Sequence, residues 1–200
     1  MQIACVRQGP KYGEDYVLKL QAMVKRHLPP AGGHEFVCYT DQEPIPGVLC
    51  ERLPAALPGW WAKVGLFKLR EPLVYFDLDV VITGSLAPLL QWEGFGIIRD
   101  WWLPGYNSSM MVLTGREGVV WDKFTPDVMR TRHAGDQQWI TECLPGQETF
   151  PAAWFPSWKA NRCGEMAEPA PGSIATIFHG SPKPDDIKVG WVPKHWRQGR

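Results

Sequence analysis

The sequence predicts an α/β protein with a parallel sheet, and three neighbouring segments carry this prediction. Residues Gln2 to Val6 form a short apolar run that is typical of a strand. Residues Asp15 to about Leu28 carry apolar side chains at helical spacing, and Glu35 to Tyr39 is a second strand-like run. Strand, helix and strand in this order form a βαβ unit with parallel strands and a right-handed crossover. Because open α/β sheets bind ligands at the carboxyl ends of their strands, we expect the functional residues there.

The chain after this unit alternates further helices and strands. A proline-rich link from Pro44 to Pro58 precedes an amphipathic helix predicted at Trp60 to Leu69, and Leu73 to Ile82 reads as one buried strand. The segment 145–171 is rich in proline and glycine, so we expect it to be irregular but ordered by its aromatic residues. The remaining predicted elements are helices at Ser85–Leu90, Val119–Phe124 and Gln137–Leu144, and strands at Phe95–Ile98, Ser109–Leu113 and Ile174–Phe178.

Composition limits the class of protein. The chain has 200 residues, 44% of them hydrophobic, which suits a single domain over residues 1–200. Its 21 basic and 21 acidic residues cancel, which argues against nucleic acid as a partner. No apolar run approaches the roughly 20 residues that a membrane span needs. The five cysteines are widely spaced and include no CxxC pair, so a reducing, cytoplasmic location is expected.

Tryptophan is unusually frequent, with 11 residues that often stand in pairs such as Trp60-Trp61 and Trp101-Trp102. A flat apolar ring with one polar group suits sugar rings and nucleobases, and it suits a core equally well. For any single tryptophan, packing is the favoured interpretation.

Two carboxylates, Asp77 and Asp79, stand one residue apart inside an apolar run. In an extended chain both would point the same way, and two like charges at the edge of a low-dielectric interior repel each other. A hard divalent cation bound by oxygen atoms relieves this repulsion. The alternative is a pair of solvated carboxylates at a strand end.

A third metal ligand is predicted at His179, directly after the apolar run 174–178. The segment from His179 to Pro184 also contains Gly180, which permits close backbone approach, and Lys183, which stands between two prolines. Together these groups suit a metal-bound phosphate. The alternative for a single histidine after a strand is a polar surface residue.

Several motifs in this order resemble the GT-A fold glycosyltransferases, most closely glycosyltransferase family 8, which includes glycogenin and the bacterial lipopolysaccharide galactosyltransferases. The resemblance implies an α/β fold with a mixed, mostly parallel central sheet flanked by helices. The motifs are Trp61-Ala62-Lys63-Val64, Asp77-Leu78-Asp79, Asp100, Tyr106-Asn107-Ser108-Ser109-Met110-Met111-Val112, Gly135-Asp136-Gln137 and His179-Gly180-Ser181-Pro182-Lys183-Pro184.

The resemblance also implies roles for individual residues. Asp77, Asp79 and His179 would bind Mn²⁺, with Mg²⁺ as a possible substitute, and the ion would hold the diphosphate of a nucleotide sugar. Gly180 and Lys183 would grip that diphosphate. The residues implied to face the donor sugar are Lys63, Asp100, Asn107 and Asp136, with Gln137 near the anomeric carbon. Tyr16, or as the second choice Tyr12, would stack on the base.

Four of these positions have structural alternatives. Lys63 could form the solvated face of its helix. Asp136 could be the N-cap of the helix at Gln137, and Asn107 could belong to a plain turn. Tyr16 lies on the apolar face of its predicted helix and could be a core residue.

The sequence therefore predicts a metal-dependent enzyme that moves a hexose from a nucleotide diphosphate sugar, UDP-linked, to the hydroxyl of a glycan, lipid or protein acceptor. The family analogy implies retention of the anomeric configuration, with Asp136 and Gln137 as the residues nearest the reacting carbon. Two alternatives stay open. A haloacid-dehalogenase-like phosphatase would use Asp77 as nucleophile and Asp79 as acid and base. A non-catalytic nucleotide- or carbohydrate-binding module would keep the fold without turnover.

Overall fold

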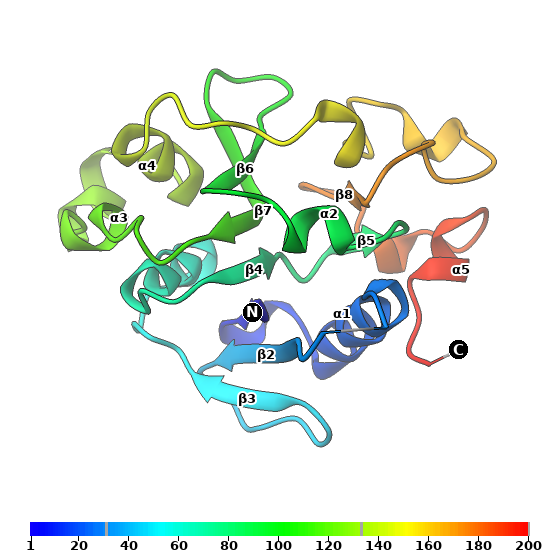
Figure 1. The fold of residues 1–200 in the computed structure, drawn as a ribbon, viewed down its shortest axis with the longest axis horizontal. Helices are drawn as coiled ribbons and strands as arrows, with labels where there is room; N and C mark the ends of the chain where they lie inside the picture. Colours follow the sequence, from blue (N-terminus) through cyan, green and yellow to red (C-terminus); the bar gives the residue numbers. More distant parts are fainter. Residues whose placement is uncertain (31, 133, 200) are drawn as a thin grey trace.

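The computed structural model describes residues 1–30, 32–132 and 134–199 and forms an α/β fold around a six-stranded sheet (Figure 1). The strands of this sheet lie in the order β3-β2-β1-β4-β7-β6. The first four strands are parallel to one another, and β7 is antiparallel to both of its neighbours. The predicted mixed, mostly parallel sheet is confirmed. The bounds are β1 Gln2–Arg7, β2 Glu35–Thr40, β3 Leu49–Arg52, β4 Leu73–Phe76, β6 Gly96–Arg99 and β7 Tyr106–Leu113.

The predicted βαβ unit is present as β1, the helix α1 (Glu14–His27) and β2. Helix α1 buries Leu20, Met23 and Val24 at the helical spacing read from the sequence. It ends at His27, before the pair Pro29-Pro30, which cannot continue a helix.

Both faces of the central strands are buried, so side chains on one of these strands alternate between two cores. In β4, Val74 and Phe76 pack in the core on the side of α1, whereas Leu73 and Tyr75 pack in the core on the opposite side. This alternation explains why the strands read as continuous apolar runs.

The acid-bearing run is not a single strand, which corrects the prediction for Leu73 to Ile82. Strand β4 ends at Phe76, residues 77–79 form a turn, and β5 (Val80–Ile82) pairs antiparallel with β8 (Ala175–Ile177) in a separate two-stranded sheet. The backbone N–H of Asp77 still donates to the carbonyl of Ser109 at 2.8 Å, and the chain then leaves the six-stranded sheet. The two carboxylates therefore lie on a turn between two sheets.

Two further segments differ from expectation. The proline-rich link contains a strand, β3, which pairs parallel with β2 at the sheet edge. The helix expected at Trp60–Leu69 is a 3₁₀ helix, Gly59–Lys68, and it is buried from Trp61 to Phe67 rather than amphipathic. Its middle part packs against α3 (Val119–Asp122) and α4 (Asp136–Cys143) and within the core on that side of the sheet, so residues 61–67 have no solvated face, whereas Trp60 and Lys68 at its ends are exposed.

The other predicted helices and strands of the second half are present, shifted at their ends by a few residues. Residues 145–171 form no long element, and Trp158 stacks on Phe178 with ring centroids 4.6 Å apart, as expected for aromatic ordering. Within the described residues no helix combines the length and apolar character needed to cross a bilayer. The remaining elements are α2 Ala87–Leu90, α4 Asp136–Cys143, α5 Val192–His195, the π helix Val128–Arg132 and the short 3₁₀ helices Gly9–Lys11, Ala152–Trp154, Cys163–Glu165 and Pro184–Asp186.

Candidate active site

A cavity of about 700 Å³ opens where β1 and β4 end and where the antiparallel strand β7 begins. This is the edge at which the sequence predicts ligand binding. Of the residues predicted for the site, those that line the cavity are Lys63, Asp77, Asp79, Asn107, Asp136, Gln137, His179, Gly180 and Lys183.

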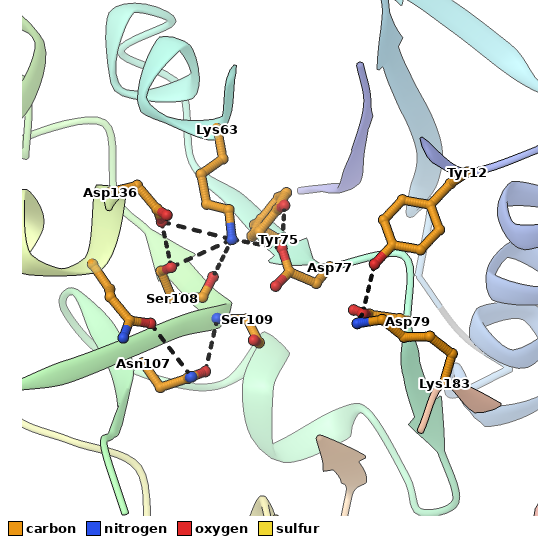
Figure 2. A network of polar contacts seen from close by, with 11 residues as sticks. Tyr12, Lys63, Tyr75, Asp77, Asp79, Asn107, Ser108, Ser109, Asp136 and Lys183 are labelled. Atoms are coloured by element: carbon orange, nitrogen blue, oxygen red, sulfur yellow. Dashed lines mark hydrogen bonds and ion pairs between the residues drawn. The ribbon is translucent and has the colours of Figure 1, made fainter. Parts of the chain in front are cut away.

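One part of the cavity is built around the buried ammonium group of Lys63, which reaches it from the 3₁₀ helix (Figure 2). The Lys63 Nζ atom donates to Asp77 Oδ1 at 2.6 Å and lies 3.7 Å from Asp136 Oδ2. It also contacts the hydroxyl of Ser108 at 3.3 Å, and that hydroxyl donates to Asp136 Oδ2 at 2.5 Å. Tyr75 donates its phenolic O–H to Asp77 Oδ1 at 2.6 Å. We call these five residues the inner cluster.

Burial makes the charges of the inner cluster depend on one another. Burial alone raises the pKa of Asp77, but the Lys63 ammonium and the hydrogen bonds outweigh it and hold that pKa below its ordinary value. Burial raises the pKa of Asp136, although Lys63 and the Ser108 hydroxyl act in the opposite direction. Burial also lowers the pKa of Lys63, but Asp136 and Asp77 reverse this effect and raise it. Lys63 is therefore a charged, buried group and not the solvated face of a helix.

A second part of the cavity is organised by Asp79, which lies two residues beyond Asp77 on the same turn (Figure 2). Asp79 Oδ2 accepts a hydrogen bond from the Tyr12 hydroxyl at 2.7 Å and forms an ion pair with Lys183. Burial and the Asp79 carboxylate raise the pKa of Tyr12 well above its ordinary value, so its O–H stays a donor. We call Tyr12, Asp79 and Lys183 the outer cluster.

The predicted metal ligand His179 lies on the wall of the same cavity. Its Nε2 atom lies 2.7 Å from the Ser157 hydroxyl. Its ring stacks on Trp101 at 5.3 Å and meets Trp102 edge-on at 4.6 Å. Burial among these groups, together with the nearby Lys159, lowers the pKa of His179, so the imidazole is neutral at pH 7.

The three predicted metal ligands therefore share one cavity. In the part of the chain that the structure describes, however, no cluster of three or more His, Cys, Asp or Glu side chains is arranged to hold an ion. Each of the two carboxylates instead pairs with an ammonium group, Asp77 with Lys63 and Asp79 with Lys183. The donor chemistry, two carboxylates and a neutral imidazole, still suits a divalent ion such as Mn²⁺.

The start of β7 and the start of α4 form the wall next to the inner cluster. Asn107 Oδ1 accepts the backbone N–H of Ser109 at 3.0 Å, and its amide nitrogen donates to Gln137 Oε1 at 3.5 Å. Asp136 is the first residue of α4, and its carboxylate accepts from Ser108 rather than capping the helix, for which Gly135 is the N-cap. Asn107 lies inside strand β7 and not in a turn.

Two predicted residues lie outside the cavity lining. Asp100 accepts the backbone N–H groups of Trp102 and Leu103, both at 2.8 Å, and so shapes the loop between β6 and β7. Tyr16 packs against Tyr12 and, edge-on, against Trp196. Of the two tyrosines considered for the base, the structure therefore brings Tyr12 to the cavity.

Sequence reasoning did not single out the residues that hold the predicted ones in place. Tyr75, Ser108 and Ser157 each bond a predicted site residue through a hydroxyl group. Strand alternation gives a signal for Tyr75, since it precedes Asp77 by two residues and projects to the same side. No local pattern indicates Ser157, because its partner is 22 residues away.

Comparison with known proteins rests on structure alone. No protein-family model matches the sequence, and no curated protein is similar enough in sequence to match it. An active-site mutant of LgtC superposes with a TM-score of 0.71 at 12% identity, covering 98% of this chain and 94% of that one. The apo form of the glycosyltransferase GlyE from Streptococcus pneumoniae gives a TM-score of 0.74 at 12% identity over 98% of this chain. The present chain spans 58% of GlyE.

A third structure, the galactosyltransferase LgtC in complex with donor and acceptor sugar analogs, gives a TM-score of 0.63 at 12% identity, covering 92% of this chain and 89% of that one. These similarities show a shared fold, and the predicted GT-A fold is thereby confirmed.

Proposed function

We propose that this protein is a glycosyltransferase that moves a hexose from a UDP-linked donor to an acceptor hydroxyl with retention of configuration. The observation that carries the proposal is the cavity itself. On a fold shared with glycosyltransferases, it gathers Asp77, Asp79 and His179, together with Lys183, from segments a hundred residues apart. Such a set of carboxylates, imidazole and ammonium suits a sugar diphosphate.

We propose a divalent ion, Mn²⁺, as the cofactor, held by Asp77, Asp79 and His179. An ammonium group already lies against each carboxylate, so a bound ion would replace Lys183 on Asp79 and share Asp77 with Lys63. A bound ion would supply Lewis-acid stabilisation of the negative charge on the departing diphosphate. Lys183 would then leave Asp79 and pair with a phosphate oxygen, and Gly180, which has a φ of 69°, would allow the backbone close to that phosphate.

The sugar end of the donor is assigned to the inner cluster and the wall beside it. Asp136 and the amide groups of Asn107 and Gln137 can each bind hydroxyl groups of a hexose. Lys63 holds Asp136 and Asp77 in fixed positions relative to each other, which preorganises both ends of the donor site. Asp136 and Gln137 are the proposed groups nearest the anomeric carbon. We assign no general base to the protein, because a retaining transfer can use the departing phosphate oxygen to take the acceptor proton.

The test compares wild-type protein with Asp79→Asn and His179→Ala in hydrolysis of UDP-hexoses with and without Mn²⁺. We expect Mn²⁺-dependent release of UDP from the wild type and at least about a hundredfold loss in either variant. The free energy of unfolding without metal should change by only about 1 kcal/mol in Asp79→Asn, since the amide keeps one hydrogen bond with Tyr12. Equal UDP release by all three proteins would contradict the assignment.

The same assay separates the two alternatives. A binding module would bind UDP in a calorimetric titration without releasing sugar from any donor. A phosphatase would hydrolyse simple phosphate esters with Asp77 as the nucleophile, and this activity would be unaffected by the loss of His179. The fold shared with glycosyltransferases favours sugar transfer over phosphate ester hydrolysis.

A further inference from the structure

The loop between β6 and β7 holds a tryptophan out in solvent beside the cavity. Trp102 is 59% exposed and its neighbour Leu103 is 56% exposed. Large apolar side chains that are both exposed and ordered often mark a binding surface, because contact with a ligand removes their apolar surface from water and lowers the free energy.

This loop is shaped before any ligand arrives. The Asp100 carboxylate accepts the backbone N–H groups of Trp102 and Leu103, and the Asp100 N–H donates to the carbonyl of Gly105 at 3.1 Å. Gly105 has a φ of 114° and fits closely against Thr141, where a Cβ atom would come within 2.7 Å of the hydroxyl. A loop fixed in this way loses little conformational entropy on binding.

The loop also packs against one residue of the cavity wall, His179. Trp101 stacks on the His179 ring at an interplanar angle of 16°, and Trp102 meets the same ring at 79°. His179 lines the cavity, so the exposed indole of Trp102 lies one side chain away from the proposed metal and diphosphate site.

We propose that Trp102 is the platform of an acceptor subsite and that the acceptor presents a neutral pyranose ring to it. This inference rests on the proposed function, since it assigns the second substrate of the same site. The apolar C–H face of a pyranose covers an indole ring, while its hydroxyl groups remain available to the polar wall of the cavity.

A membrane surface fits the loop less well than a sugar does. Attachment to an anionic bilayer uses basic residues beside the apolar ones, and residues 99–105 contain one basic residue, Arg99, and one acidic residue, Asp100. The charge of the loop itself therefore cancels, and a carbohydrate acceptor is the favoured occupant.

The test uses the neutral disaccharides lactose, maltose and cellobiose as probes, with the full chain and without any donor, in saturation-transfer NMR titrations. We expect at least one of them to bind the wild type and Trp102→Ala to weaken that binding about tenfold. Trp102→Phe should retain most of the affinity, since it keeps a flat ring. The matched control is Leu103→Ala, which removes a similarly exposed apolar group from the same loop and should stay within about twofold of the wild type.

Three outcomes would overturn the proposal. These are binding of none of the disaccharides, equal losses in Trp102→Ala and Leu103→Ala, and co-sedimentation with phosphatidylcholine/phosphatidylglycerol vesicles that depends on both side chains. A separate UDP titration of the wild type distinguishes this result from a failure of the proposed function. If the wild type does not bind UDP, the proposed donor site is wrong. The disaccharide titration tests only the proposed role of Trp102.

Discussion

Lys63 and Lys183 each form an ion pair with one of the two carboxylates of the turn at residues 77–79, but their surroundings differ. The Lys63 side chain is 7% exposed and lies among Asp77, Asp136 and Ser108 in the inner cluster. The Lys183 side chain is 22% exposed and pairs with one carboxylate in the outer cluster. The Lys63–Asp77 ion pair is therefore expected to be a fixed part of the fold. The Lys183–Asp79 ion pair is expected to open when a ligand binds. Burial rather than residue type separates a positioning lysine from a binding lysine.

The largest expected effect is the loss of the inner cation. Lys63→Met should lower the free energy of unfolding by about 3 kcal/mol or more, because Asp77 and Asp136 lose their buried counter-charge. Urea unfolding measures this change. The matched control is Lys68→Met on the same 3₁₀ helix, where the exposed ammonium group donates to the Pro54 carbonyl at 3.3 Å. The control should cost less than about 1 kcal/mol, and similar small losses in both variants would contradict the contrast.

The second expected effect is a dependence on pH that belongs to Asp77. The folded-state pKa of Asp77 is lowered from its ordinary value of 3.8, so its contribution to stability is present above that value and is lost as pH falls through the folded pKa. The pKa of Asp136 is raised, so its contribution has the opposite sign and is lost as pH rises. In metal-free protein, the stability difference between wild type and Asp77→Asn should shrink as pH falls below 3.8. A difference that stays constant in urea titrations across that range would show that Lys63 does not act through the ionised carboxylate.

The smallest effect on stability is expected in the outer cluster. Lys183→Met should change the free energy of unfolding by less than about 1 kcal/mol, because a partly exposed ion pair contributes little. It should strengthen Mn²⁺ binding, since the ammonium no longer competes for Asp79, and weaken UDP binding about tenfold. Calorimetric titrations of both ligands measure this, with Lys188→Met, whose ammonium donates to the Asp185 carbonyl, as the control on the same tail. Weaker Mn²⁺ binding in Lys183→Met would contradict the expectation that Lys183 leaves Asp79 when the ion binds.

Much of the fold could be predicted from sequence where local pattern and tertiary packing agree. The helix α1 and the strands β1 and β2 follow from apolar spacing and from the prolines that end the helix. The run from Leu73 to Ile82 could not be divided correctly, because both of its halves are apolar and buried, although in different sheets. The burial of the 3₁₀ helix Gly59–Lys68 depends on elements that follow it in the chain, so its own periodicity is misleading.

The candidate site follows the same division. Residues of strong chemical character, such as Asp79 and His179, could be selected from the sequence, and the cavity brings them together. Their hydrogen-bond partners could not be selected, since Ser108 and Ser157 are ordinary residues until folding places them against Asp136 and His179. Asp100 was selected by resemblance, and the structure shows it shaping a loop through two backbone N–H groups.

The central claim is that the cavity beside Asp77 and Asp79 holds a nucleotide diphosphate together with a divalent ion. A crystal structure of the protein grown with UDP and Mn²⁺, with anomalous diffraction recorded for manganese, tests this most directly. We predict a manganese peak beside the two carboxylates, UDP in the cavity, and the Lys183 ammonium group on a phosphate oxygen. An absent peak, UDP bound elsewhere, or Lys183 still paired with Asp79 beside bound UDP would contradict the claim.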